Sequence, residues 1–104
     1  MKPLAVLRSQ LKAGAFEFSQ HALKRIVERN IANAEIREAG AGAVVIEDYP
    51  TDKYGPSCLL LGMTLRQRPL HRQVTRQFGP KVKIITIYEP DPSVWLNYTQ
   101  RRPT

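Results

Sequence analysis

The feature that most limits the possible folds is a change of hydrophobic pattern near Ala43. Before it, apolar residues recur at the three- and four-residue spacing of amphipathic helices. After it, β-branched and alternating residues dominate, as they do in strands. Helices followed by a run of strands favour an α+β fold over an alternating α/β fold. We therefore predict N-terminal helices packed on one face of an antiparallel sheet of about four strands.

Three helices are predicted before this change. The first covers residues 3–13 and stops at Gly14, a good helix terminator. The second covers about 20–30 and follows Ser19, whose hydroxyl can cap its first turn. The third begins near Asn33 and ends at a glycine. The apolar stripe of the first helix is Leu4, Leu7 and Leu11, and the stripe of the second helix that we expect to face the core is Ala22, Leu23, Ile26 and Val27.

The strands are predicted from shorter apolar runs. Residues 44–46 are β-branched, 58–61 are continuously apolar, 70–78 alternate, and 82–88 are again rich in β-formers. Residues 16–18 fit either a short strand or an extended entry to the second helix. We expect one core that buries together Leu59, Leu61, Ile84, Leu23 and Ile26.

Composition sets the class of partner. The chain has 104 residues, typical of one domain, and we treat 1–104 as a single domain. Sixteen Lys and Arg against nine Asp and Glu give a net charge of +7. Such a charge favours polyanions, with nucleic acid first and an acidic protein next. The sequence predicts a cytoplasmic protein with no membrane segment, and one cysteine and two histidines predict no metal site and no cofactor.

The positive charge is unevenly distributed. From Lys53 to Tyr88 the sequence contains basic residues and no acidic one. A stripe of one sign along strands suits a phosphate backbone, although basic residues also protect edge strands from aggregation. Arg72 and Arg76 share strand parity and should project from one face. The candidate nucleic-acid-binding residues are Arg66, Arg68, Arg72, Arg76, Lys81 and Lys83.

The second helix carries a candidate for chemistry. His21, Arg25 and Arg29 are four residues apart and form one ridge opposite the apolar stripe. A helix N-terminus disfavours a protonated imidazole, so His21 could act as a base beside two guanidiniums that hold phosphate. A solvated basic helix face would have the same spacing.

The same helix carries a family resemblance. Residues 18–31, FSQHALKRIVERNI, resemble the opening motif of the bacterial domain of unknown function 4258 family. Residues 46–50, 54–62, 69–71 and 84–91 resemble its strand blocks in order. The resemblance covers about residues 16–95, and the first helix lies outside it.

The resemblance also implies a reaction. The family's layout is similar to that of small RelE-like and barnase-like ribonuclease toxins, which are metal-independent and activate the ribose 2′-hydroxyl. It implies His21, Arg25 and Arg29 as catalytic residues, with His71 as a counterpart and Thr86 and Tyr88 nearby. The leading hypothesis is therefore a toxin-like ribonuclease. The alternatives are a non-catalytic nucleic-acid-binding module and a domain that pairs with an acidic, antitoxin-like protein.

Overall fold

The computed structural model describes residues 1–53 and 55–103, which form three helices and seven strands. In chain order they are α1 (Leu4–Ala13), β1 (Phe16–Phe18), α2 (Gln20–Arg29), α3 (Asn33–Ala41), β2 (Val44–Tyr49), β3 (Ser57–Met63), β4 (Pro69–Thr75), β5 (Val82–Tyr88), β6 (Trp95–Leu96) and β7 (Gln100–Arg101). Among the described residues, none of the helices has the length and apolarity needed to cross a membrane.

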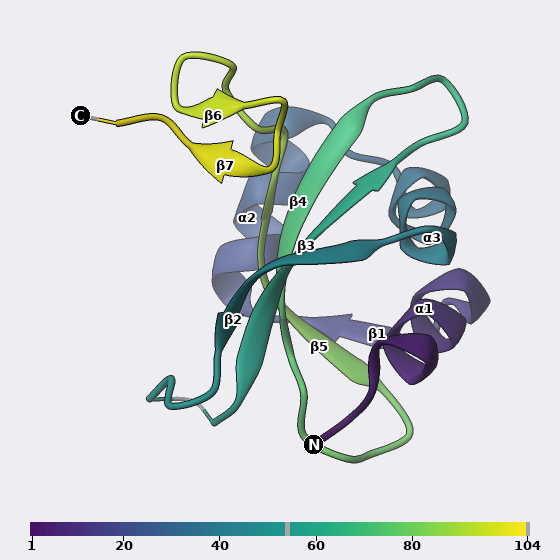
Figure 1. The fold of residues 1–104 in the computed structure, drawn as a ribbon. Helices are drawn as coiled ribbons and strands as arrows, with labels where there is room; N and C mark the ends of the chain where they lie inside the picture. Colours follow the sequence, from purple (N-terminus) through teal and green to yellow (C-terminus); the bar gives the residue numbers. More distant parts are fainter. Residues whose placement is uncertain (54, 104) are drawn as a thin grey trace.

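The predicted α+β class is confirmed. The main sheet has the order β1-β5-β4-β3-β2, and β2 to β5 form the expected antiparallel meander (Figure 1). The short segment Phe16–Phe18 adds a fifth strand, which pairs with β5 in parallel and makes the sheet mixed. Strands β6 and β7 form a separate hairpin.

Helices α1 and α3 cover one face of the sheet, called here the inner face. Leu7 and Leu11 of α1 are buried in the main core, as the predicted stripe requires. A Cβ atom on Gly40 of α3 would overlap the side chain of Leu11, so this glycine allows the two helices to pack closely. The sheet contributes to this core Cys58, Leu60, Leu70, Val74, Val82, Ile84 and Ile87.

Helix α2 lies at the edge of the sheet, beside β5. The backbone N–H of Ser19 donates to the carbonyl of Ile84 at 3.0 Å, after which the chain turns into α2. Ala22 is buried and Ile26 is partly buried against the core. The prediction that Leu23 and Val27 are buried is wrong, because their exposed fractions are 50% and 82%. A helix at a sheet edge contacts the core along a narrow line, so half of its apolar stripe stays outside.

The opposite, outer face of the sheet carries a different set of side chains. Because side chains alternate along a strand, the register that puts Leu60, Arg72 and Ile87 on the inner face puts their neighbours on the outer face. The hairpin β6–β7 lies toward this face, on the side of the sheet away from α1 and α3 (Figure 1). The outer-face residues of β3 to β5 include Ser57, Leu59, Leu61, His71, Gln73, Thr75, Thr86 and Tyr88.

Leu59 and Leu61 therefore do not join the predicted common core. Leu59 is buried, but it lies outside the main core cluster, and Leu61 is only partly buried. Of the five residues expected to pack together, Ile84 is fully buried and Ile26 partly buried on the inner side. The alternation of β3 sends its apolar residues to both faces, as the continuous apolar run 58–61 predicts.

Candidate nucleic-acid interface

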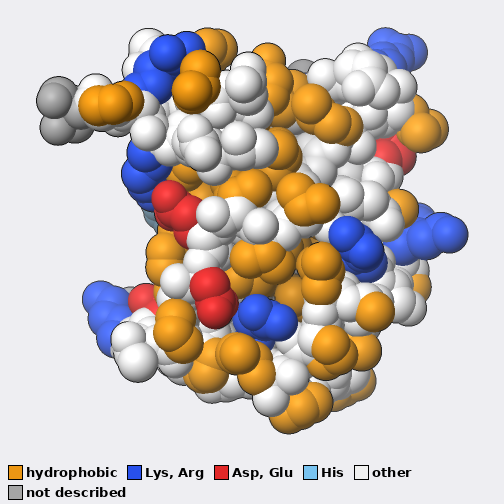
Figure 2. All heavy atoms as spheres, viewed as in Figure 1, with side chains coloured by type: hydrophobic (Ala, Val, Ile, Leu, Met, Phe, Trp, Pro, Cys, Tyr) orange, Lys and Arg blue, Asp and Glu red, His pale blue; other side chains and the backbone are white. Residues whose placement is uncertain are grey.

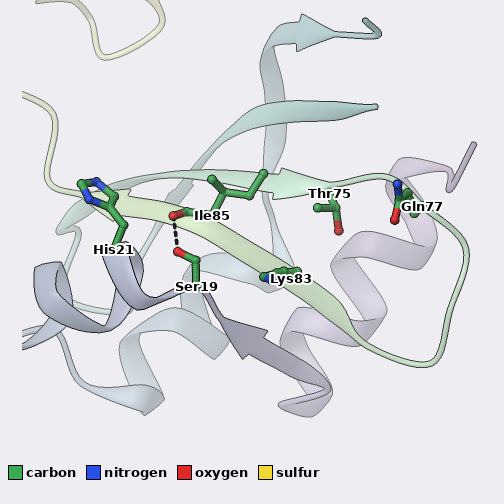
Figure 3. A pocket seen from close by; sticks show the side chains of 6 residues that line it. All are labelled: Ser19, His21, Thr75, Gln77, Lys83 and Ile85. Atoms are coloured by element: carbon green, nitrogen blue, oxygen red, sulfur yellow. Dashed lines mark hydrogen bonds between the residues drawn. The ribbon is translucent and has the colours of Figure 1, made fainter. Parts of the chain in front are cut away.

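The first turn of α2 is fixed by Ser19. Its hydroxyl accepts a hydrogen bond from the Ala22 backbone N–H at 3.0 Å and donates one to the Ile85 carbonyl at 2.6 Å (Figure 3). The predicted N-cap is therefore confirmed, and it also ties the helix to β5. This double contact holds the start of the helix, and with it His21, against the outer side of β5.

His21 lines a hollow of about 530 Å³ between α2 and the strands β4 and β5. Figure 3 shows His21 at one end, Ile85 and Lys83 in the middle, and Thr75 and Gln77 at the other end. Both His21 and Lys83 are exposed to solvent, and no carboxylate among the described residues lines the hollow. The arrangement puts an imidazole and an ammonium group around one space that is open to an anion.

Arg25 and Arg29 border a neighbouring hollow of about 320 Å³. Thr86 and Tyr88 of β5 form part of its wall, and Trp95 closes it on the side of the hairpin. Arg25 also lies 3.7 Å from the Glu28 carboxylate in an exposed ion pair, which is a weak interaction. The helix ridge thus runs past two adjoining hollows, with His21 at the first and both arginines at the second.

His71 is placed elsewhere. It is buried on the outer face of β4, with its Nε2 atom 2.6 Å from the Tyr98 carbonyl and its Nδ1 atom 3.2 Å from the Tyr88 hydroxyl. Because a carbonyl can only accept, Nε2 carries a proton and donates it. Burial lowers the pKa of His71 below its ordinary value, so the ring is neutral at pH 7. His71 lines neither hollow, and the structure does not bring it to His21.

The prediction that Arg72 projects from an exposed basic face is wrong. Arg72 does lie on the same face of β4 as Leu70 and Val74, as the alternation of side chains along a strand predicts. That face, however, packs into the core. Its side chain is fully buried, and its terminal nitrogens donate to the carbonyls of Ile36 and Ala39 in α3 at 3.2 Å each. The sequence pattern could not distinguish a basic face from a core face that contains one arginine.

Two further predicted cations are engaged in ion pairs. Arg68 lies 3.0 Å from Glu35 and 2.7 Å from Glu89. Arg76 donates from Nε to the Lys2 carbonyl at 3.1 Å, and its Nη1 is 3.5 Å from Asp48. Acids from outside the acid-free stretch therefore neutralise part of it after folding.

The three remaining cations are exposed. Arg66 lies in a hollow that it shares with Glu35 and Glu38. Lys83 lines the His21 hollow, and Lys81 lines the one that adjoins it at Thr75 and Gln77. In Figure 2 the Lys and Arg side chains stand in separate groups among hydrophobic and acidic ones. The exposed positive charge near His21 is therefore the part of the predicted stripe formed by Lys81 and Lys83.

A second polar group escaped the sequence analysis. Glu47 and Tyr49 of β2 are hydrogen-bonded to each other, and Arg101 of β7 makes two hydrogen bonds to the Glu47 carboxylate at 2.9 and 3.2 Å. The hydrogen bond from Arg101 lowers the pKa of Glu47. The available signal was the i, i+2 spacing of Glu47 and Tyr49, which puts both on one face of a strand. Their partner lies 54 residues away, beyond the reach of local pattern.

No group of three or more His, Cys, Asp and Glu side chains in the described ranges is arranged to hold a metal ion. No curated protein and no solved structure is significantly similar to the chain. A family model does match it, over residues 18–89, which include α2 with its His21 ridge, α3 and the strands β2 to β5. Helix α1 and the hairpin β6–β7 lie outside the matched residues. The chain therefore belongs to the DUF4258 family, a domain of unknown function.

Proposed function

We propose that this domain is a toxin-like, metal-independent ribonuclease that cleaves RNA by attack of a ribose 2′-hydroxyl on the adjacent phosphate. One observation carries the proposal: His21 of α2 and Lys83 of β5 line the same solvent-open hollow. The two residues are 62 positions apart in the sequence and come together only through the docking of α2 on β5. A base and a fixed cation around one space are what this reaction requires.

In the proposed reaction, the imidazole of His21 takes the proton of the 2′-hydroxyl. The 2′-oxygen then forms a bond to phosphorus, and the bond from phosphorus to the 5′-oxygen breaks. The Lys83 ammonium stabilises the charge on the phosphorane oxygens and supplies a proton to the departing 5′-oxygen. The products are a 2′,3′-cyclic phosphate and a free 5′-hydroxyl, and proton exchange with water restores both side chains.

The surroundings of the hollow suit a nucleic-acid strand. Lys81 lies on one side of it, and Arg25 and Arg29 border the next hollow along α2. Guanidinium and ammonium groups at these positions can contact the phosphates that flank the cleaved one. The net charge of +7 adds a long-range attraction for RNA.

The test uses the purified chain and a labelled single-stranded RNA, with and without a chelator. We expect cleavage that the chelator leaves unchanged, with a 2′,3′-cyclic phosphate on the 5′ product. His21→Ala should lower the rate by about 10²-fold or more, the usual worth of a positioned base. Gln20→Ala changes the adjacent exposed residue of α2 and should cleave like the parent. Absence of cleavage, or an unchanged rate in His21→Ala, rejects the proposal.

A non-catalytic nucleic-acid-binding module is the second candidate. It is favoured by the burial of His71, which leaves one histidine at the hollow instead of the expected pair of histidines. This candidate predicts RNA affinity that falls steeply with salt and no product under any condition. The cleavage experiment above separates the two, because binding without product supports only the second.

A further inference from the structure

A set of titratable side chains lies together on the outer face of the sheet, apart from His21. His71 of β4 is directly opposite Tyr88 of β5, and its Nδ1 is 3.2 Å from the Tyr88 hydroxyl. Glu47 and Tyr49 stand on β2, which is separated from β4 only by β3. Two strand spacings amount to about 10 Å. The register puts Glu47 level with Leu59 and Gln73, so Glu47 lies two residues along the sheet from His71 on the same face. We call these four residues the outer-face cluster.

The hairpin β6–β7 covers this cluster. The Trp95 ring packs edge-on against the His71 ring with centroids 4.5 Å apart, and the Arg101 guanidinium lies 4.6 Å from the Trp95 centroid. Arg101 also forms the two hydrogen bonds to Glu47, and the Tyr98 carbonyl accepts a hydrogen bond from His71 Nε2. Each titratable side chain of the cluster is therefore hydrogen-bonded to the hairpin or to another cluster member.

The hairpin holds this position with unusual backbone geometry. Asn97 and Tyr98, at its tip, both have left-handed backbone conformations, with φ of 51° and 63°. That region is uncommon for a residue as bulky as tyrosine and costs free energy. The conformation aims the Tyr98 carbonyl at His71. The strained residue is thus Tyr98, whose carbonyl accepts the hydrogen bond from the His71 imidazole.

The residues that match the family model include the outer-face cluster but not the hairpin β6–β7. Residues 18–89 match the family model, and all four cluster residues lie within this range. Trp95, Tyr98 and Arg101 lie outside it. The cluster therefore lies within the residues that match the family, whereas the three hairpin residues that contact it lie outside them.

We propose that Glu47 and His71 form the acid–base pair of a second phosphodiester-cleaving site, which the hairpin β6–β7 keeps closed. The inference takes RNA as the substrate class from the proposed function, but it uses different catalytic groups. Glu47, freed from Arg101, accepts the proton of the 2′-hydroxyl as the 2′-oxygen bonds to phosphorus. The protonated form of His71 donates a proton to the 5′-oxygen as its bond to phosphorus breaks. Glu47 gains one proton and His71 loses one, and exchange with water resets both.

A binding surface for the substrate already adjoins the covered site. Tyr88 and Trp95 form part of the wall of the 320 Å³ hollow, and Arg25 and Arg29 border the same hollow. Displacement of Trp95 would connect His71 to a space that has two guanidiniums for phosphate. Closure also has a chemical effect, because burial lowers the pKa of His71 and keeps the ring in its neutral form. The hairpin thus blocks access to His71.

The experiment loosens the hairpin without touching the cluster. Arg101→Gln removes the two bonds to Glu47 from an exposed side chain, and Trp95→Ala in addition removes the ring over His71. Arg102→Gln is the matched control, since Arg102 is also exposed and bonds to the Pro92 carbonyl instead of to Glu47. We expect faster amide hydrogen exchange in residues 95–101 in the double variant. We also expect its RNA cleavage to rise by about tenfold or more, which is less than the full worth of a positioned acid or base, about 10²-fold or more. The control should match the parent in both measurements.

A third substitution identifies the groups responsible. Glu47→Gln, added to the double variant, should remove the gain, whereas His21→Ala added to it should leave the gain in place. The inference is overturned if the amides of residues 95–101 stay protected, if they exchange faster with no gain in cleavage, or if the gain survives Glu47→Gln. The proposed function is tested separately, by the cleavage rate of His21→Ala in the chain whose hairpin is unchanged. The two failures are therefore distinguishable.

Discussion

The Nη2 atom of Arg72 lies 3.2 Å from the carbonyl oxygen of Ala39, near the C-terminal end of α3. Helix ends leave carbonyls without intrahelical partners, and the helix dipole favours a cation there. Desolvation lowers the pKa of Arg72 to about 10, which still leaves the guanidinium charged at pH 7. Arg72 is thus a buried cation that joins β4 to α3, and its role is structural.

Replacement of Arg72 should therefore destabilise the fold. Arg72→Met removes the donors to Ile36 and Ala39 and leaves a partly filled site, which should lower the free energy of unfolding by about 2–5 kcal/mol. Urea denaturation followed by circular dichroism measures this loss. Arg66→Met, a matched change at an exposed arginine, should stay within about 0.5 kcal/mol of the parent. Equal stability of the two variants would contradict this role.

Gly62 of β3 is the point where α3 comes closest to the sheet. A Cβ atom there would overlap the Ala39 carbonyl and also contact Arg72, so Gly62→Ala should push α3 away from β3. We expect a loss of about 1–3 kcal/mol in the free energy of unfolding, as for other overpacked cores. Gly42→Ala is the control, because nothing lies within 4 Å of its added atom. Thermal unfolding of the two variants side by side provides the measurement.

The Ser19 hydroxyl should contribute to both stability and site geometry. Ser19→Ala removes the cap of α2 and the bond to Ile85, which should cost about 0.5–2 kcal/mol. Ser19→Thr keeps a hydroxyl and should retain most of the stability. If His21 acts as proposed, the alanine variant should also cleave RNA more slowly than the threonine variant. Identical melting temperatures for alanine, threonine and serine at this position would show that the cap contributes nothing.

The burial of His71 should make stability fall in mild acid. Its folded-state pKa lies below the ordinary value of 6.5, with Tyr88, Glu47, Arg101 and Arg72 as its titratable neighbours. Below about pH 6.5 the unfolded chain binds a proton that the folded chain does not, so the free energy of unfolding decreases as the pH falls. The melting temperature should therefore drop between pH 7.5 and 5.5. Glu47 also has a lowered pKa, but its contribution is lost only below about 4.5, outside this range. A flat or rising melting temperature would contradict the prediction.

Positive charge at the His21 hollow should control RNA affinity. Lys83→Gln removes the cation in the hollow, so single-stranded RNA should bind more weakly and with a smaller dependence on salt. Lys12→Gln removes the same charge from an exposed position on α1 and should have a smaller effect. Fluorescence anisotropy at several salt concentrations measures both. Equal loss in the two variants would show that net charge alone determines binding.

Local pattern was sufficient for the helices and for the antiparallel strands. The stripe Leu4, Leu7 and Leu11 and the cap at Ser19 act within a few residues, so the sequence displays them directly. The errors arise where a partner is distant. Leu23 and Val27 match a core stripe, yet α2 sits at the sheet edge and leaves them exposed.

The candidate site shows the same limit. Spacing along α2 predicts that His21, Arg25 and Arg29 share a helix face, but it cannot show that they adjoin two different hollows. The alternation of side chains along a strand correctly predicts that Arg72 and Leu70 lie on the same face, but it cannot show which face of the sheet the helices cover. The bond between Glu47 and Arg101 depends on how the hairpin folds back, and no periodicity encodes it.

The parallel pairing of β1 with β5 has a consequence for how the chain folds during synthesis. Phe16 pairs with Val82, so the edge of the sheet on which α2 docks does not exist until β5 has been made. At a translation rate of about 5–20 residues per second, the segment between these strands takes several seconds to appear. For that time the strand Phe16–Phe18 and α2 lack the strand with which the first pairs and on which the second docks. Any His21 site on this edge is therefore among the last parts of the molecule to form, which delays activity until the domain is almost completely synthesised.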